Sequence, residues 1–169
     1  LYRHFRDTLR DPHLARAIED NIDMRNVISA AAPKWDGGYV MCAATGSGDM
    51  AVVRDPAGIR PAFYYIDDEV VVVASERPVI QTVWDVDADK VTELAPGEAI
   101  IVRRDATTDV VGLLPQQPNA RCSFERIYFS RGSDVDIYRE RKLLGRNIVP
   151  AVLDSIDGGF DHTVFSSSP

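Results

Sequence analysis

The sequence predicts an α+β protein, a layered α/β/β/α sandwich followed by the first strand–helix–strand unit of a second, α/β domain. Three observations predict it: a helical period over residues 1–32, four short β-rich runs from residue 37 on, and an apolar strand at residues 70–73 that lacks alternation. A strand without alternation is buried on both faces, so another layer must lie beyond its sheet. A chain of 169 residues is long enough to bury such a core.

Residues 1–32 are expected to form helices on the outside of the sheets. Apolar residues recur four positions apart in the first ten residues, which places them on one helical face. Pro12 suits the first turn of a second helix, and Pro33 closes a third that begins near Asp23. These helices would form one outer layer of the sandwich.

Four β-rich runs predict an antiparallel meander, because short strands with tight turns between them pair with their neighbours in sequence. The runs are GYVMCAA, MAVVRD, AFYYID and VVVVAS. Turn signals at Gly46–Gly48, Pro56–Gly58 and Asp67–Glu69 separate them. We interpret Gly46–Gly48 as a hairpin turn and not as a phosphate loop, because it lacks the G-x-G-x-x-G spacing and leads into no helix.

The turn at Pro56–Gly58 is flanked by a charged cluster, Arg54, Asp55 and Arg60. Such a cluster could bind a ligand, but charges at a turn more often serve the turn itself. We therefore expect a hairpin turn between two sheet strands, with the three charged side chains pairing to fix it.

After the fourth run the sequence predicts a short helix and then further strands. Ser75 is expected to cap the helix. Its core face would consist of Val79, Ile80, Val83 and Trp84. Pro96-Gly97 is typical of a type II turn, with Gly97 supplying the positive φ. The strands around this hairpin would be KVTEL, EAIIV and DVVGLLP.

A second domain is expected from residue 122. Gln116–Arg121 is polar, contains a proline and predicts a linker, which leaves residues 1–115 as the sandwich. Residues 122–169 contain RIYFS, a helical pattern over Asp134–Ile156 and then HTVFSS, the opening of a parallel βαβ unit. Such a unit has nothing to pack against, and the chain starts at Leu1 and not at Met, so we interpret the sequence as an internal fragment of a longer protein.

Composition argues against several classes of function. A net charge of −7 argues against binding to nucleic acid, which needs a basic face. No window approaches the ~20 apolar residues of a membrane span. Cys42 and Cys122 lie in different segments, which fits a reducing cytoplasm and predicts no disulfide framework. The three histidines are too scattered for a local metal site.

Four motifs occur in the order RDPAGIRPAFYY, ASERPVIQ, LAPGEAIIV and CSFERIYFSR. Together they resemble the glutamine amidophosphoribosyltransferases, class-II amidotransferases of purine synthesis. The resemblance implies a glutaminase sandwich of the N-terminal nucleophile hydrolase type, which releases ammonia from glutamine. A phosphoribosyltransferase domain would then join the ammonia to phosphoribosyl pyrophosphate. The resemblance implies a structural role for the motif residues Arg54, Asp55, Gly58, Arg60, Pro61, Ser75, Glu76, Pro96 and Gly97.

The resemblance implies no catalytic residue within this chain. The family's nucleophile is a cysteine at the very N-terminus whose own α-amino group is the base, whereas Leu1 stands first here and Cys42 lies mid-strand. The Asn-Gly pair of the oxyanion hole and the acidic phosphoribosyl pyrophosphate loop are also absent from the sequence. We therefore predict an inactive fragment without cofactor-binding or metal-binding residues, whose parent could use Mg²⁺ with phosphoribosyl pyrophosphate.

The start of the second domain departs from the family's pattern. Arg131–Asp134 reads Arg-Gly-Ser-Asp where the family has Arg-Pro-Asp-Ser. Arg131 and Arg141 are candidates for interdomain contacts or for an anion clamp, although charges there usually pair structurally. Cys122 matches an iron–sulfur ligand of some members, but others keep the cysteine without a cluster, so no cluster is expected.

The expected partners are the remainder of the parent chain and further copies of it in a homo-oligomer. Two alternatives stay open. A non-catalytic scaffold or regulatory module with a degenerate glutaminase fold would keep the sandwich and lose the chemistry. An asparagine synthetase-like glutaminase would share the sheet motifs, but FERIYFSR would not come after them.

Overall fold

The computed structural model describes residues 12–166, so the helix expected in the first ten residues lies outside the described part. Its first elements are α2 (Pro12–Asp20), α3 (Met24–Ala31) and a 3₁₀ turn (Ala32–Lys34). The Asp23 side chain caps α3 by accepting the backbone N–H of Arg25 at 2.9 Å. Pro12 opens α2 and Pro33 lies in the turn that ends α3, as the proline positions predict.

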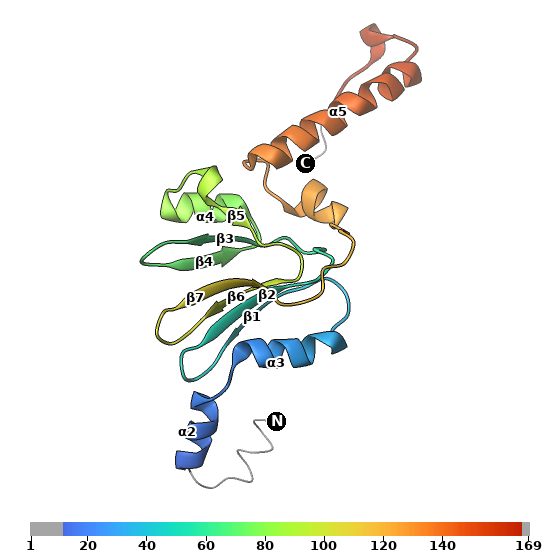
Figure 1. Cartoon of the computed structure of the whole chain (residues 1–169). Coiled ribbons are helices and arrows are strands. Elements are labelled where there is room, and N and C mark those ends of the chain that lie inside the picture. The colour runs from blue at the N-terminus through green and yellow to red at the C-terminus, as the bar shows by residue number, and fades with distance from the viewer. Residues whose placement is uncertain (1–11, 167–169) are drawn as a thin grey trace.

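Within the described residues the strands form two antiparallel sheets (Figure 1). The larger sheet has the order β1–β2–β6–β7, with β1 at Val40–Ala44, β2 at Met50–Arg54, β6 at Glu98–Val102 and β7 at Thr108–Gly112. The smaller sheet has the order β4–β3–β5, with β4 at Val71–Ala74, β3 at Phe63–Ile66 and β5 at Thr92–Glu93. The single meander expected from the sequence is wrong. The hairpins β1–β2 and β3–β4 belong to different sheets, and the chain crosses between them at Pro56–Gly58.

The two sheets face each other, α3 lies on the outside of the larger one, and α4 (Arg77–Trp84) lies on the smaller one (Figure 1). Alternate residues of β2 and β6 point to opposite faces, so these strands contribute to two cores. The core under α3 contains Met24, Ile28, Ala32, Ala51, Val53, Ala99 and Ile101. The core between the sheets contains Ala62, Leu94 and Ile100, with Val52 and Tyr64 packed against it.

Two expectations about the smaller sheet are wrong. β4 is half-buried and not buried on both faces, because it is an edge strand. Ser75 does not cap α4, since Glu76 occupies the cap position without a side-chain bond. Of the expected core face, Ile80 is fully buried, but Val83 and Trp84 are 64% and 39% exposed.

The described residues from 122 to 166 contain helices and no strand. They form a π-helical turn η3 (Glu125–Phe129), α5 (Val135–Ser155) and a 3₁₀ turn (Phe160–His162). The strands expected at RIYFS and, over residues 163–166, at HTVFSS are therefore wrong. A strand needs a neighbour to satisfy its backbone groups, and here the Ser130 N–H instead closes the η3 turn on Glu125 O at 2.8 Å. The domain boundary itself stays a prediction.

The helix α5 extends away from the sheets (Figure 1). It has 21 residues, and Ile137 in its first turn is its only buried residue. Apolar side chains further along, such as Leu143 and Ile148, are exposed. No helix in the described part of the chain, α5 included, is long and apolar enough to cross a membrane.

Candidate functional site

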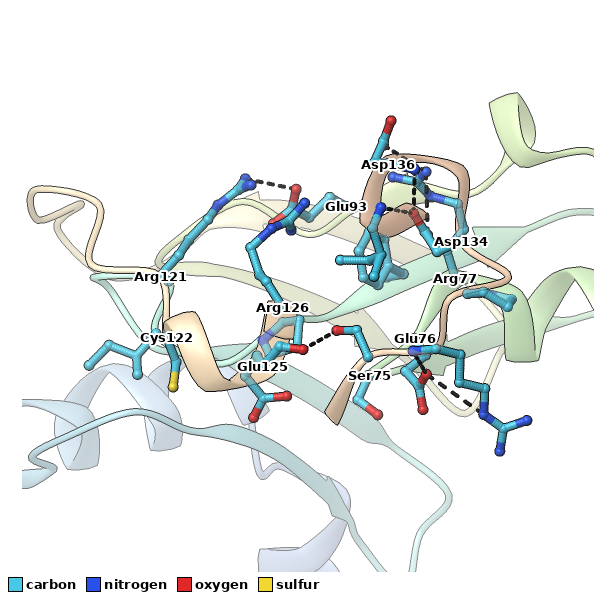
Figure 2. Close-up of a pocket in the computed structure, with 18 of the residues that line it drawn as sticks. Ser75, Glu76, Arg77, Glu93, Arg121, Cys122, Glu125, Arg126, Asp134 and Asp136 are labelled. Atoms are coloured by element: carbon cyan, nitrogen blue, oxygen red, sulfur yellow. Dashed lines mark hydrogen bonds and ion pairs between the residues drawn. The ribbon is translucent and has the colours of Figure 1, made fainter. Parts of the chain in front are cut away.

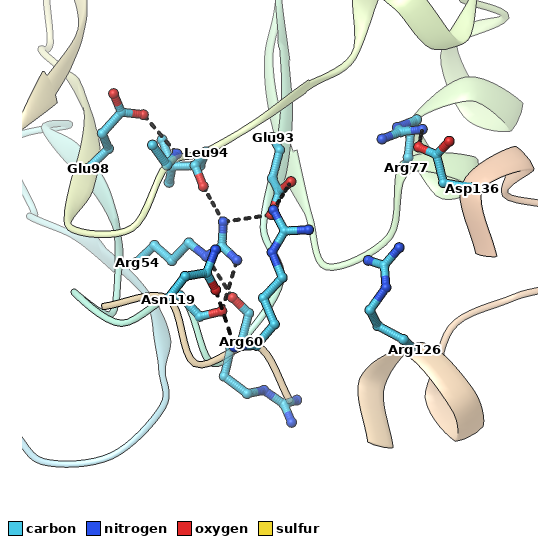
Figure 3. Close-up of polar contacts among 12 residues, drawn as sticks. Arg54, Arg60, Arg77, Glu93, Leu94, Glu98, Asn119, Arg126 and Asp136 are labelled. Atoms are coloured by element: carbon cyan, nitrogen blue, oxygen red, sulfur yellow. Dashed lines mark hydrogen bonds and ion pairs between the residues drawn. The ribbon is translucent and has the colours of Figure 1, made fainter. Parts of the chain in front are cut away.

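Arg54 ends β2 and is buried where the chain crosses between the sheets. Its guanidinium donates hydrogen bonds to three backbone carbonyls and one carboxylate (Figure 3). The acceptors are Arg60 O at 2.7 Å, Gly58 O at 3.1 Å, Leu94 O, and Glu93 Oε1 at 3.0 Å. A planar fork of donors can serve acceptors in several directions at once. Arg54 therefore ties the loop around Pro56–Gly58, the first crossing between the two sheets, to the end of β5.

Asp55 has no exposed surface and binds the same crossing through its carboxylate. Its oxygens accept the backbone N–H groups of Ala57 at 3.1 Å, Ile59 at 2.9 Å, Arg60 at 3.1 Å and Tyr39 at 3.4 Å. Burial, and then the Asp55 charge, raises the pKa of Tyr39. The expected pairing among the three charged side chains is thus wrong. Arg54 and Asp55 bind mainly backbone groups, and the Arg60 side chain forms an ion pair with Glu125.

A second crossing, at Pro96-Gly97, packs against the first. Gly97 has a φ of 77° and the Glu98 N–H closes the turn at 3.0 Å, so the positive φ predicted for this glycine is confirmed. The turn joins β5 to β6 of the other sheet and is not a hairpin. The Gly97 N–H donates to Asp55 O at 3.1 Å, and a Cβ added at Gly58 would stand 2.8 Å from Pro96 Cγ. The two crossings therefore form one packed unit.

The segment expected to be a linker is fastened to the first crossing. The backbone N–H groups of Gln117, Ala120 and Cys122 donate to the carbonyls of Pro56, Ala57 and Ile59, at 2.8, 2.8 and 3.2 Å. The two segments therefore run alongside each other. The direction in which the chain leaves the sheets is set by the loop that Arg54 and Asp55 hold.

A small cavity of about 80 Å³ lies where this segment, α4 and the start of α5 meet (Figure 2). Its walls carry the cations Arg54, Arg77, Arg121, Arg126 and Arg131 and the carboxylates Glu76, Glu93, Glu125, Asp134 and Asp136. The Arg121 guanidinium pairs with Glu93 at 2.9 Å. Substrate pockets usually enclose about 300 Å³ or more. We therefore describe this cavity, which is smaller than most substrate pockets, as a charged junction between the sheets and the segment after residue 122 (the second segment).

Most of the motif residues predicted from the sequence meet at the charged junction. Gly58, Pro61, Ser75 and Glu76 line the cavity beside Arg54. Arg60 reaches the junction through Glu125, whose Oε1 contacts Arg60 as an ion pair without hydrogen-bond geometry. Pro96 and Gly97 lie behind it, in the second crossing.

Arg131 and Arg141, the candidates for interdomain contacts, differ in what they bind. The Arg131 N–H donates to Glu76 Oε2 at 3.1 Å, and its Nε lies 3.8 Å from the same oxygen. Arg131 thus reaches from the second segment to α4. Arg141 donates to Ile127 O at 2.8 Å and to Ser130 O at 2.6 Å. These bonds hold η3 to α5 and stay within the second segment.

Sequence reasoning missed Arg77. Its Nη1 lies 3.0 Å from Asp136 Oδ2 and 3.6 Å from Asp134 Oδ2, so it bridges α4 and α5. A signal was present, because a cation at the first position of a helix opposes the helix dipole. Arg77 occupies that position in α4, which indicates that its charge serves a partner outside the helix.

The two cysteines lie apart, Cys42 exposed in β1 and Cys122 half-buried at the junction. Over the described residues 12–166 there is no group of three or more His, Cys, Asp or Glu side chains that could hold a metal ion.

Comparison with known proteins decides the family. The profile of the class-II glutamine amidotransferases matches residues 12–111, from α2 into β7. The chain belongs to the class-II glutamine amidotransferases. An amidophosphoribosyltransferase of Methanothermobacter thermautotrophicus is 29% identical over 136 residues, which make up 78% of this chain and 28% of the relative. That of Rhizobium etli is 30% identical over 126 residues, 70% of this chain and 25% of the relative.

Solved structures agree with this membership. The glutamine phosphoribosylpyrophosphate amidotransferase from B. subtilis, complexed with ADP and GMP, superposes with a TM-score of 0.54 and 25% identity over 72% of this chain and 27% of that one. The allosteric regulatory enzyme of purine biosynthesis superposes with a TM-score of 0.55 and 27% identity over 66% of this chain and 23% of that one. This class-II amidotransferase chain therefore shares their α+β fold with antiparallel sheets. It spans about a quarter of the length of the curated relatives it matches.

Proposed function

We propose that the chain is part of a glutamine-dependent amidophosphoribosyltransferase-like enzyme of purine biosynthesis, in which ammonia from glutamine is transferred to phosphoribosyl pyrophosphate. One observation carries the proposal. The backbone of residues 117–122 is bonded to the loop that Arg54 and Asp55 hold, so the motif of the class-II amidotransferases also positions the segment after the sheets. A two-domain transferase needs such a fixed exit. The names of the relatives supply the reaction.

The order of layers supports the finer assignment of the sheets. α3, the larger sheet, the smaller sheet and α4 follow one another in space (Figure 1), which is the αββα order of an N-terminal nucleophile sandwich. Residues 1–115 then form the back part of a glutaminase domain. The segment after residue 122, with η3 and α5, begins a phosphoribosyltransferase-like domain.

Neither cysteine of this chain is the glutaminase nucleophile in our proposal. That nucleophile needs its own free α-amino group as the base. The nitrogen of Cys42 is a peptide nitrogen within β1, and that of Cys122 donates to Ile59 O at 3.2 Å. The chain therefore contributes scaffold and junction, and glutamine, phosphoribosyl pyrophosphate and Mg²⁺ bind elsewhere in a cytoplasmic homo-oligomer without an iron–sulfur cluster.

The test is an assay of the full-length gene product for glutamate release from glutamine, with and without phosphoribosyl pyrophosphate. We expect release that depends on phosphoribosyl pyrophosphate, and none from residues 1–169 alone. If the full-length protein makes no phosphoribosylamine with either glutamine or free ammonia, the non-catalytic scaffold is the correct function. If residues 1–169 release ammonia and Cys42→Ala or Cys122→Ala abolishes it, our location of the nucleophile is wrong.

A further inference from the structure

Two helices begin at the charged junction, one on each side of it. α4 starts after Glu76 and α5 starts after Asp134. A helix N-terminus carries partial positive charge, so two of them brought together repel each other unless anionic groups lie between them. Asp134 provides one such group, because its Oδ1 accepts the N–H groups of Asp136 and Ile137 at 2.9 and 3.2 Å.

The charged residues at these two helix starts pair crosswise (Figure 2). Arg77, on α4, binds the acids of α5, with Nη1 3.0 Å from Asp136 Oδ2 and 3.6 Å from Asp134 Oδ2. Arg131, just before α5, binds the acid of α4: its backbone N–H donates to Glu76 Oε2 at 3.1 Å, and its guanidinium Nε lies 3.8 Å from the same oxygen. Each arginine is thus paired with an acid on the other side of the junction, so the pairs stabilise only the closed junction.

The pairs differ in burial. The Arg77 side chain is 17% exposed and that of Asp134 is 8% exposed, whereas that of Arg131 is 70% exposed. The Arg77 guanidinium also lies 5.1 Å from the centre of the Phe63 ring. Removing one partner of a buried pair is strongly unfavourable, while an exposed pair contributes little and is screened by salt. Breaking the pairs of Arg77 is therefore expected to destabilise the closed junction more than breaking the pair of Arg131.

We propose that Glu76, Arg77, Arg131, Asp134 and Asp136 form a junction clasp, an ion-pair device that closes the second segment onto the sheets and opens when its charges are screened or removed. Ile137, the buried residue of α5, lies in the turn that carries the clasp acids, so the clasp acts where this helix meets the sheets. Opening separates the two helix starts and uncovers the thiol of Cys122 in the cavity. The clasp does not depend on the proposed reaction, since a non-catalytic module would carry it as well.

Two rates measured on the full-length protein report how often the clasp is open, the alkylation rate of Cys122 and the amide exchange rate of Ile137. Cys122 is half-buried at the junction and Cys42 is exposed on β1, so peptide-resolved alkylation gives a reporter and an internal reference. Amide hydrogen exchange at Ile137 gives the second reporter. Both rates follow the population of the open state when closing is fast.

Two variants each remove one charge of the less exposed contact, that between Arg77 and Asp134 (the inner variants), and keep the rest of the site. Asp134→Asn preserves a good helix cap, and Arg77→Met preserves apolar contact with Phe63. The matched control is Arg104→Met, which breaks the exposed pair with Asp20 at 2.7 Å, on the larger sheet.

We expect Cys122 of the wild type to alkylate faster as NaCl rises from 0.05 to about 1 M, because the Debye length falls to about 3 Å. In Arg77→Met and Asp134→Asn the Cys122 alkylation rate at low salt is about tenfold or more above wild type, and its salt dependence weakens. Ile137 loses amide protection in Arg77→Met, which leaves its own bond to Asp134 Oδ1 in place. Arg104→Met behaves as wild type. Unchanged Cys122 and Ile137 rates in both inner variants would overturn the proposal. So would an equal rise in the control, or lost amide protection in β2 and β6, which would show global loosening.

Discussion

Arg54 and Asp55 are consecutive, buried, oppositely charged residues that hold one loop from two sides. The Arg54 guanidinium donates to the carbonyls of Gly58 and Arg60, and the Asp55 carboxylate accepts the N–H groups of Ile59 and Arg60. The loop lacks a sheet partner, so these two side chains supply the bonds that a ladder would otherwise provide. The charge of each is spread over fixed backbone dipoles and not neutralised by direct contact with the other.

Replacing Arg54 by lysine tests this arrangement. Arg54→Lys keeps the charge but not the planar fork, so it leaves two or more buried carbonyls without a donor. We expect the free energy of unfolding to fall by about 3 kcal/mol, measured by urea denaturation. Arg104→Lys is the control, because Arg104 is 52% exposed in its pair with Asp20, and its effect should stay within about 0.5 kcal/mol. Equal losses in both variants would contradict the role given to Arg54.

The packed crossings predict a rank order of glycine substitutions. Gly97→Ala places Cβ 2.6 Å from the backbone oxygen of Leu114, whereas Gly58→Ala places it 2.8 Å from the Pro96 ring, and both residues have positive φ. A backbone oxygen can shift less than a proline ring carbon to make room for the new Cβ. Gly97→Ala should therefore lower the melting temperature more than Gly58→Ala. Gly112→Ala has nothing within 4 Å and should be neutral, or stabilising by up to about 1 kcal/mol. A Gly97→Ala protein as stable as Gly112→Ala would show that the crossings are not tightly packed.

Local patterns predicted the existence of most elements over residues 12–115. The helices α2 and α3, the strands and the φ of Gly97 follow from capping, alternation and turn chemistry. The sheet to which each strand belongs did not follow. Pro56–Gly58 and Pro96-Gly97 read locally as hairpin turns, but whether the flanking strands pair depends on Arg54 reaching Leu94, 40 positions away. A sequence window does not contain that contact.

The junction was predictable only in part. The sequence predicts a contact for Arg131 from its place at the start of the second segment, but its partner Glu76 lies 55 residues earlier in the chain. RIYFS has the composition of a strand, yet it lies in a π-helical turn. Ser130 closes this turn on Glu125 O, and Arg141 of α5 binds the carbonyls of Ile127 and Ser130. Propensity was overridden by contacts that only the folded chain provides.

The contact between η3 and α5 predicts a pH effect. The hydrogen bond from Arg126, with Nε 2.6 Å from Glu140 Oε2, lowers the pKa of the Glu140 carboxyl. A depressed folded pKa stabilises the contact above the unfolded pKa, near 4.3, and this stabilisation is lost as pH falls through the folded pKa. In an NMR titration Glu140 should titrate below its ordinary value, and Arg126→Met should raise its midpoint. Identical midpoints in both proteins would contradict the contact.

Because residues 117–122 are bonded to the loop that Asp55 organises, we predict that the Asp55 carboxylate controls amide hydrogen exchange in that segment. The N–H groups of Gln117, Ala120 and Cys122 bond to carbonyls of the loop that Asp55 organises. Asp55→Asn replaces one acceptor oxygen with an NH₂ group that faces backbone donors, so the loop loses bonds worth about 1–3 kcal/mol. Amide exchange at those three positions should then accelerate by about ten- to a hundredfold.

The matched control for Asp55→Asn is Asp105→Asn. The Asp105 carboxylate also accepts a backbone bond, from Thr107 at 3.0 Å, but in the exposed turn between β6 and β7, to which none of the three amides bonds. This variant should change exchange near Thr107 and leave the three amides at their wild-type rates. If Asp55→Asn speeds exchange at Ile59 and Arg60 but not at Gln117, Ala120 and Cys122, the segment is held by something other than the loop. The motif would then organise the sheets without setting the exit of the chain.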